Sequence, residues 1–227
     1  MSGGRPWFRT LALVLGFAFL YIPIVSLVVF SFNANQSATV WTGFSLDWYR
    51  AAFANQALRQ AAGNSLLIAV CASMVATAIA TLAALGTSRG AKFKGLQLSM
   101  GAIMLPLVLP EIVVGVATLA LFSTIGLSLG YGNLIIAHTV FCIPFAFLPI
   151  RARLNDMDLS LEQASADLYA GPWRTFRKVT LPLLWPSLLA GSLLIALHML
   201  VEFGALSIIG LQTFTTAIYQ QFELEFS

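Results

Sequence analysis

The sequence predicts an all-α integral membrane protein, a polytopic bundle of about five transmembrane helices. Three observations predict this class. Hydrophobic residues make up 59% of the 227 residues and charged residues only 9%, whereas a soluble domain carries about 25% charged residues. Five apolar stretches are each long enough to cross a hydrocarbon core of roughly 30 Å. One long polar segment in the second half of the chain separates two of these stretches.

The first two spans are expected near residues 11–32 and 64–85. The alternative for the first is a signal peptide, but its apolar run is too long, Pro23 interrupts it, and no clear cleavage site follows. We therefore expect an uncleaved span. The aromatic-rich run Trp41–Phe53 between the two spans is typical of a membrane–water interface. The second span is rich in Ala, Ser and Thr, which lets neighbouring helices approach closely.

The third span, near residues 98–122, is broken by Pro106 and Pro110, and Glu111 follows directly. Prolines free backbone carbonyls, which is tolerated where a helix faces protein or a water-filled cavity. A carboxylate at this point is costly in lipid, so Glu111 is expected to face the bundle interior or a polar pathway. The alternative is that Glu111 lies near a helix end and reaches water.

The fourth and fifth spans, near residues 134–150 and 183–209, carry the two histidines. A lone histidine in an apolar span is more often a packing residue than a ligand, which is the reading for His138. In the fifth span, His198 and Glu202 are four residues apart and therefore share a helix face. They could form a hydrogen bond or line a pathway, but the pair supplies too few ligands for a metal site.

Several classes of site and partner are not expected. The net charge of +3 is small and scattered, so no nucleic-acid partner is predicted. Cys71 and Cys142 lie in apolar runs without metal-ligand spacing and are interpreted as core thiols. No metal or other cofactor and no catalytic set of residues is predicted. The final stretch, residues 211–227, mixes polar with apolar residues and is not interpreted as a span.

The polar segment Glu162–Pro182 is predicted to form two short amphipathic helices. Ser160 and Gln163 fit a capping box that would start the first helix. Residues Tyr169–Gly171 break the helical pattern, and Pro172 directly after them suits the first position of a second helix. The predicted apolar positions are Leu161, Ala164, Leu168, Trp173, Phe176 and Val179. Two such helices between spans predict a docking surface for another protein.

This segment resembles the cytoplasmic coupling loop of binding-protein-dependent ABC importer permeases. The residues that fall on the pattern of that family are Glu162, Ala164, Asp167, Leu168, Ala170, Thr180, Leu181 and Pro182. Two positions depart from it, because Ser165 replaces an alanine and Tyr169 stands where the glycine usually is. We expect Gly171 to supply the bend instead.

The resemblance implies a single importer transmembrane domain over residues 1–227, with a coupling loop at 151–182. It implies three protein partners besides membrane lipid: a dimer of ATPase subunits, a second homologous permease subunit or a second copy of this chain, and a periplasmic or extracellular substrate-binding protein. The residues expected to couple to the ATPase are Glu162, Ala164, Asp167, Leu168, Gly171, Trp173, Leu181 and Pro182. The sequence contains no GxxxxGK[ST] loop, so ATP would be used by the partner subunit.

Basic residues predict the orientation. If the N-terminus is cytoplasmic, segments 1–10, 86–97 and 151–180 lie inside and hold every Lys and Arg except Arg50 and Arg59. The positive-inside rule favours this arrangement. It places the coupling loop in the cytoplasm, where an ATPase would bind. The resemblance implies a multi-pass protein of the bacterial inner membrane.

Two substrates remain open. The stretches Leu20–Asn33, Trp41–Phe53 and Met104–Gly115 resemble permeases of spermidine/putrescine importers. The stretch Ala196–Phe226 is more similar to the end of the first half of fused ferric-iron permeases. The longer matching region favours a polyamine. The candidate residues of its pathway are Glu111, His198 and Glu202.

Permeases of this type commonly have six spans, so the resemblance implies that the chain is a fragment or the first part of a longer permease. A function of another class, a secondary transporter, is compatible with the hydropathy and the broken helices. The coupling segment argues against it, because a secondary transporter does not dock an ATPase.

Overall fold

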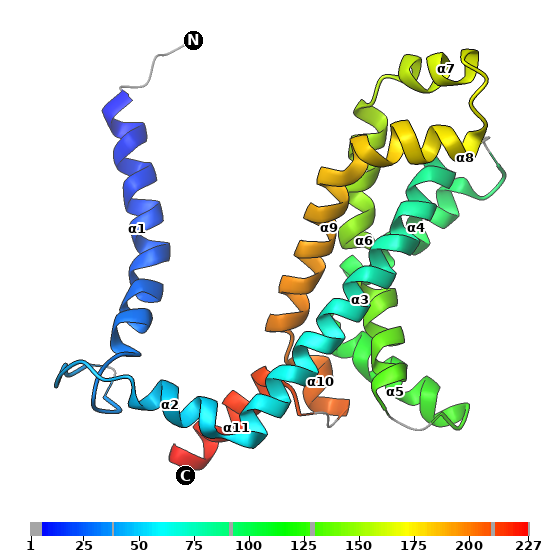
Figure 1. The fold of residues 1–227 in the computed structure, drawn as a ribbon. Coiled ribbons are helices and arrows are strands. Elements are labelled where there is room, and N and C mark those ends of the chain that lie inside the picture. Colours follow the sequence, from blue (N-terminus) through cyan, green and yellow to red (C-terminus); the bar gives the residue numbers. More distant parts are fainter. Residues whose placement is uncertain (1–5, 38, 91–92, 128–129, 210–211, 227) are drawn as a thin grey trace. The chain divides into compact units, whose positions relative to one another are not determined.

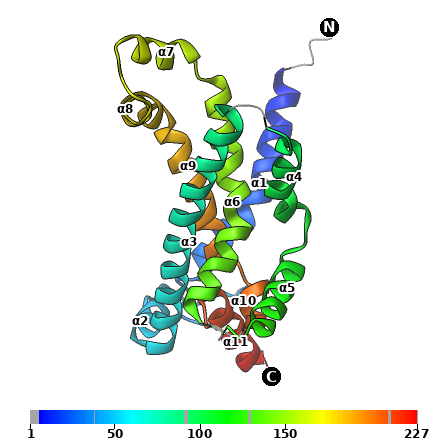
Figure 2. The ribbon, with the colours of Figure 1, turned by 90° about the vertical axis from the view of Figure 1, so that its right-hand side faces the viewer.

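The regular elements of the structure are helices (Figures 1 and 2). The structure, a computed structural model, describes residues 6–37, 39–90, 93–127, 130–209 and 212–226. The chain divides into two compact units, residues 1–59 and 60–227. Four helices are long and apolar enough to cross a membrane, or five if the bent pair α4–α5 counts as one span. The predicted all-α class with about five spans is confirmed.

The first unit begins with helix α1 (Pro6–Phe30), which is predominantly apolar from Leu11 onward. None of its most apolar stretch is buried within the chain. A helix that is apolar on every side is typical of a membrane span surrounded by lipid or by other helices. Pro23 lies inside α1 without ending it.

A folded loop connects α1 to α2 (Asp47–Ala54) and is built around Asn33, whose side chain is fully buried. Its Nδ2 donates to the carbonyl of Val40 at 2.7 Å, and its Oδ1 accepts from the backbone N–H of Thr42 at 2.8 Å. The indole Nε1 of Trp48 donates to the carbonyl of Asn33 at 3.0 Å. Asn33 therefore supplies the hydrogen bonds that this loop would otherwise take from water.

In the second unit, helix α3 (Gln56–Ser88) presents a buried face of small residues. Along this face lie Ala69, Ala72, Ala76, Ala80 and Ala84. They share one core with residues of α6 (Tyr131–Asp156) and α9 (Leu181–Val201). The largest buried side chains in that core include Phe147, Ile150 and Leu154 from α6. Small side chains on α3 let the bulky residues of α6 approach its backbone.

Helices α6 and α9 form the most extensive helix pair of this unit. Gly191 on α9 lies against Ala146 on α6, and a Cβ added at Gly191 would be 3.0 Å from the Cα of Ala146. Glycine at this position therefore sets how closely the two helices approach. Beyond this contact, the guanidinium Nε of Arg153 on α6 donates to the carbonyl of Leu183 on α9 at 3.2 Å.

The third predicted span is indeed broken. It consists of α4 (Leu96–Val108) and α5 (Glu111–Thr124), which are bent by 109°. The break falls at Leu109–Pro110, both in extended backbone conformation. Pro106 lies within α4, so Pro110 is the proline that coincides with the bend.

The fifth span is shorter than predicted. Helix α9 ends at Val201, Glu202 has an extended backbone conformation, and α10 (Gly204–Ile209) is a separate helix. The expectation of one helix over residues 183–209 is therefore wrong. The last described helix is α11 (Phe214–Phe226), which is not among the candidate spans. The interpretation of residues 211–227 as no span stays a prediction, and residues 211 and 227 lie outside the described residues.

Prediction for packing: Gly191→Val should destabilise the second unit by about 1–3 kcal/mol, because the added methyl groups meet the α6 backbone. The measurement is thermal unfolding of the purified protein in detergent. Gly101→Val is the matched control, since a Cβ at Gly101 on α4 meets nothing within 4 Å. Equal melting temperatures for the two variants would contradict the prediction.

Candidate functional site

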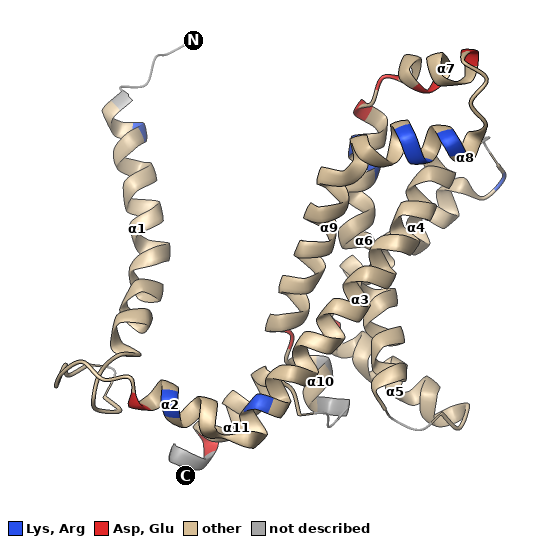
Figure 3. Cartoon of the chain, viewed as in Figure 1, with Lys and Arg blue, Asp and Glu red and all other residues tan. Residues whose placement is uncertain are grey.

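The segment predicted to couple to an ATPase forms helix α7 (Leu159–Asp167), helix α8 (Pro172–Thr175) and a π-helical turn (Phe176–Thr180). The π-helical turn runs directly into α9, so Leu181–Pro182 continues a helix and does not close the segment. Pro172 starts α8, as predicted. Within residues 60–227, Lys and Arg gather at the end of the bundle that carries α7 and α8 (Figure 3).

Asp158 caps the first coupling helix. Its carboxylate accepts a hydrogen bond from the backbone N–H of Ser160 at 2.9 Å. The predicted capping box with Ser160 at the start is wrong, because Asp158 precedes it and offers a charged acceptor. The same bond lowers the pKa of Asp158. The cap is therefore intact at neutral pH and weakens only as the pH falls through that lowered pKa.

The bend between the two coupling helices lies at Tyr169, which has a left-handed backbone with φ of 58°. Gly171 has an ordinary φ of −66°, so the expectation that Gly171 supplies the bend is wrong. Tyr169 thus adopts the conformation that suits a glycine, the residue usual at this place in the coupling loops that the segment resembles. A non-glycine residue in this conformation costs about 1 kcal/mol.

Glu162 faces the bundle and joins four segments. Its Oε2 accepts from Nε of Arg89, in the turn directly after α3, at 3.2 Å, and its Oε1 accepts from the hydroxyl of Thr180 at 3.0 Å. The same Arg89 donates to the carbonyl of Leu154 on α6 at 2.8 Å. The side chains of Arg89 and Glu162 are only 19% and 21% exposed. This Arg89–Glu162–Thr180 node ties α7 to α3, α6 and the π-helical turn.

The other predicted coupling residues mostly face outward. Leu168 is 82% exposed and Trp173 is 70% exposed, although both are apolar. The exposed set also includes Ala164, Asp167, Gly171 and Pro182, and Leu181 is half-buried. Tyr169 at the bend is 97% exposed. An apolar surface rimmed by charge is typical of a site that binds another protein.

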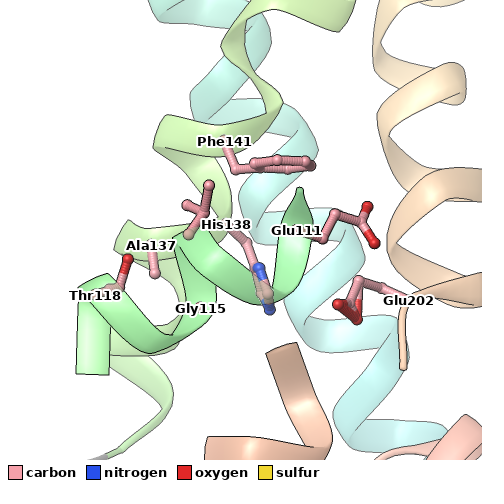
Figure 4. A pocket seen from close by; sticks show the side chains of 8 residues that line it. Glu111, Gly115, Thr118, Ala137, His138, Phe141 and Glu202 are labelled. Atoms are coloured by element: carbon pink, nitrogen blue, oxygen red, sulfur yellow. The ribbon is translucent and has the colours of Figure 1, made fainter. Parts of the chain in front are cut away.

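A second candidate site lies where α5 begins and α9 ends. A pocket there is lined by residues of α5, α6 and the break after α9 (Figure 4). Glu111 is the first residue of α5 and Glu202 directly follows α9. The lining residues are Glu111, Val114, Gly115, Thr118, Ala137, His138, Phe141 and Glu202.

His198 lies beside this pocket and contacts Glu111. The imidazole Nε2 is 2.7 Å from Oε1 of Glu111, a close electrostatic contact that lacks the angle of a well-formed hydrogen bond. The ring is stacked against Phe145 and Phe141 of α6, with centroids 4.9 Å and 5.7 Å apart. Phe141 and Phe145 fix the position of the His198 ring, and this ring in turn contacts the Glu111 carboxylate.

The structure brings Glu111, His198 and Glu202 together, but not in the predicted way. His198 and Glu202 do not share a helix face, because α9 ends before Glu202. Two interpretations of Glu111 were open from the sequence, a place facing the bundle interior and a place near a helix end. In the structure Glu111 is at a helix end and also lines a pocket within the bundle. Among the described residues, no three His, Cys, Asp or Glu side chains are arranged to hold a metal ion.

Three residues of these sites were not predicted from the sequence to belong to a site. Arg89 was only one of several basic loop residues, and its partner Glu162 is 73 positions away. His138 was interpreted as a packing residue, and Phe141 was not distinguished from other aromatics. The spacing of His138 and Phe141, three residues apart on the buried face of α6, is the signal that could have linked them.

The arrangement is that of a helical membrane protein with an interrupted span, an exposed amphipathic segment and a pocket lined by two carboxylates. The family of binding-protein-dependent transport system inner membrane components matches residues 76–227. The chain belongs to this family.

Curated relatives agree with the family match. The chain is 38% identical over 195 residues to the putrescine transport system permease protein PotI of Escherichia coli (strain K12), covering 83% of this chain and 69% of the relative. It is 39% identical over 190 residues to the spermidine/putrescine transport system permease protein PotC of Haemophilus influenzae, covering 84% and 74%. A further relative from Haemophilus influenzae, the Fe(3+)-transport system permease protein FbpB 2, is 40% identical over 164 residues, covering 72% of this chain but 32% of the relative.

Prediction for the node: Arg89→Ala and Glu162→Ala should be non-additive, with a coupling energy of about 1–2 kcal/mol. The physical reason is that each substitution leaves the other charge without its main partner in a largely buried place. The measurement is a double-mutant cycle by thermal or denaturant unfolding. Asp47→Ala and Arg50→Ala, an ion pair with both side chains 78% exposed, form the matched control cycle and should couple by less than about 1 kcal/mol.

Proposed function

We propose that this chain is the membrane-spanning permease subunit of an ATP-binding-cassette importer for a polyamine of the putrescine or spermidine type. The chain would form the translocation pathway together with a second homologous permease subunit or a second copy of itself. A separate ATPase dimer would bind the coupling segment Glu162–Pro182, and a substrate-binding protein would deliver the solute. The single observation that carries this proposal is a family-type coupling loop on a proline-broken helical bundle.

The surface of α7 and α8 supports the docking of an ATPase. Leu168 and Trp173 are large, apolar and mostly exposed on the same short segment. Exposed side chains of this kind become binding hot spots when a partner encloses them. The node at Glu162 then acts inside the permease, where it transfers a push on α7 to α3 and α6 as a rigid-body movement.

The acidic pocket supports a cationic solute. Glu111, Glu202 and the neighbouring His198 would form part of the pathway, because carboxylates between apolar helices attract positive charge and are costly without it. The names of the broadly matching relatives favour putrescine or spermidine. Ferric iron is the second candidate, supported by the relative FbpB 2.

The distribution of charge supports a cytoplasmic N-terminus. With this orientation the cationic end of residues 60–227, which carries α7 and α8, lies in the cytoplasm (Figure 3). The ATPase would bind there, and the pocket near Glu111 would lie toward the outer side of the bacterial inner membrane.

Prediction for docking: the double variant Leu168→Ala, Trp173→Ala should weaken association with the ATPase by about 2 kcal/mol or more. The measurement is titration of the detergent-purified permease complex with the ATPase subunit. Leu193→Ala is the control, because Leu193 is 59% exposed and lies on α9, well beyond the end of the coupling segment. Wild-type affinity in the double variant would remove this surface as the docking site.

Prediction for transport: proteoliposomes that contain the permease with its ATPase, partner permease and binding protein should accumulate radiolabelled putrescine only when ATP is supplied. The same vesicles should not accumulate ferric iron delivered by a binding protein. Uptake driven by an ion gradient without ATP would favour a secondary transporter. ATP-dependent uptake of iron without putrescine would favour the second candidate substrate.

A further inference from the structure

We propose that the pocket between α5, α6 and the break after α9 binds one protonated primary amino group of the transported solute, an inference that rests on the function proposed above. The pocket has a volume of about 20 Å³. A cavity of roughly 10–15 Å³ or more holds one water molecule, and an ammonium group is of similar size. The space therefore accepts one such group.

The pocket offers hydrogen-bond acceptors in the number that this group requires. A primary ammonium has three N–H donors and no acceptor. Two acceptors are the carboxylates of Glu111 and Glu202. The third is His138, which is only 4% exposed and whose Nε2 has no hydrogen-bond partner among the described residues. With its proton on Nδ1, the neutral ring accepts at Nε2.

A buried polar atom without a hydrogen-bond partner costs free energy. The Nε2 atom of His138 therefore indicates a partner that is not part of this chain, such as a bound solute. Figure 4 shows the His138 ring extending from α6 with Glu111 and Glu202 on the same side of it. The three acceptors come from three different elements, and they line one pocket because α5 begins and α9 ends at this point.

The rest of the lining suits an alkylamine better than a metal ion. Val114, Gly115 and Ala137 are small or apolar and can contact the methylene groups that follow the amino group. The ring of Phe141 also lines the pocket and can add a cation–π contact. Among the described residues no group of side chains is arranged to hold a metal ion.

Each of the two carboxylates also has a structural neighbour of its own. Glu202 follows the C-terminus of α9, where the helix dipole adds partial negative charge to that of the carboxylate. His198 holds Glu111 at 2.7 Å from outside the pocket lining. His198 is therefore a positioning residue, whereas His138 contacts the bound group.

The test uses the complete transporter in proteoliposomes, with radiolabelled putrescine delivered by a saturating amount of its binding protein. Uptake and ATP hydrolysis are measured in the same vesicles for His138→Phe, His138→Gln and Glu202→Gln. Because the binding protein is identical throughout, differences arise in this chain. Glu223→Gln, which changes an exposed acid on α11 outside this pocket, is the matched control.

We expect His138→Phe and Glu202→Gln to lower the putrescine carried per ATP hydrolysed by about tenfold or more, with ATP hydrolysis within about twofold of the wild type. His138→Gln, whose amide oxygen can accept near the place of Nε2, should carry putrescine within about threefold of the wild-type ratio. A loss of packing would instead lower the assembly of all His138 variants alike.

The outcomes separate this inference from the proposed function. A wild-type transporter that carries putrescine, with unchanged ratios in His138→Phe and Glu202→Gln, overturns the ammonium site alone. A His138→Gln variant that loses as much transport per ATP as His138→Phe also overturns it, because the acceptor is then not what matters. A wild type that carries no putrescine overturns the proposed function and this inference together.

Discussion

Polar groups between apolar helices must find partners within the protein, because the hydrocarbon interior supplies none. Two interruptions of helices create this demand in the second unit, at Leu109–Pro110 and at Glu202–Phe203. The structure brings both to one place, where α10 packs against α5 and the hydroxyl of Thr215 donates to the carbonyl of Glu202 at 2.7 Å. The carboxylates of Glu111 and Glu202 therefore line the same pocket. The two helix interruptions and the two carboxylates lie together, and for this reason we regard this part of the bundle as a candidate pathway.

Close helix packing connects this pocket to the coupling loop. The small-residue face of α3 and the Gly191–Ala146 contact hold α3, α6 and α9 in one core. Helix α6 accepts a hydrogen bond from Arg89 through Leu154 at one end and carries His138 and Phe141 toward the other. Helix α9 continues from the π-helical turn to His198. Under the proposed function, packed helices that move as rigid bodies would carry a displacement of α7 and α8 to the pocket.

Side chains of the coupling loop point in two directions, toward the bundle and away from it. Glu162 and Thr180 face the bundle and bind Arg89 directly or through one another, whereas Leu168 and Trp173 face outward. The inward node makes α7 part of the permease core, and the outward apolar side chains remain available to a partner. The strained backbone at Tyr169 separates the two helices at the most exposed point of the loop.

The sequence by itself determined the membrane class, the positions of most spans, the break near Pro110 and the place of the polar segment before the last long span. These follow from composition, from the length of apolar runs and from proline geometry, which act over short stretches of chain. Only the tertiary structure decided that Glu162 turns inward to Arg89, that Asp158 and not Ser160 caps α7, and that the bend lies at Tyr169. Only the tertiary structure ended α9 at Val201 and paired His198 with Glu111 in place of Glu202. The physical reason is that a side chain's partner depends on which helix ends meet in space, and helices distant in sequence meet through packing that no local pattern encodes.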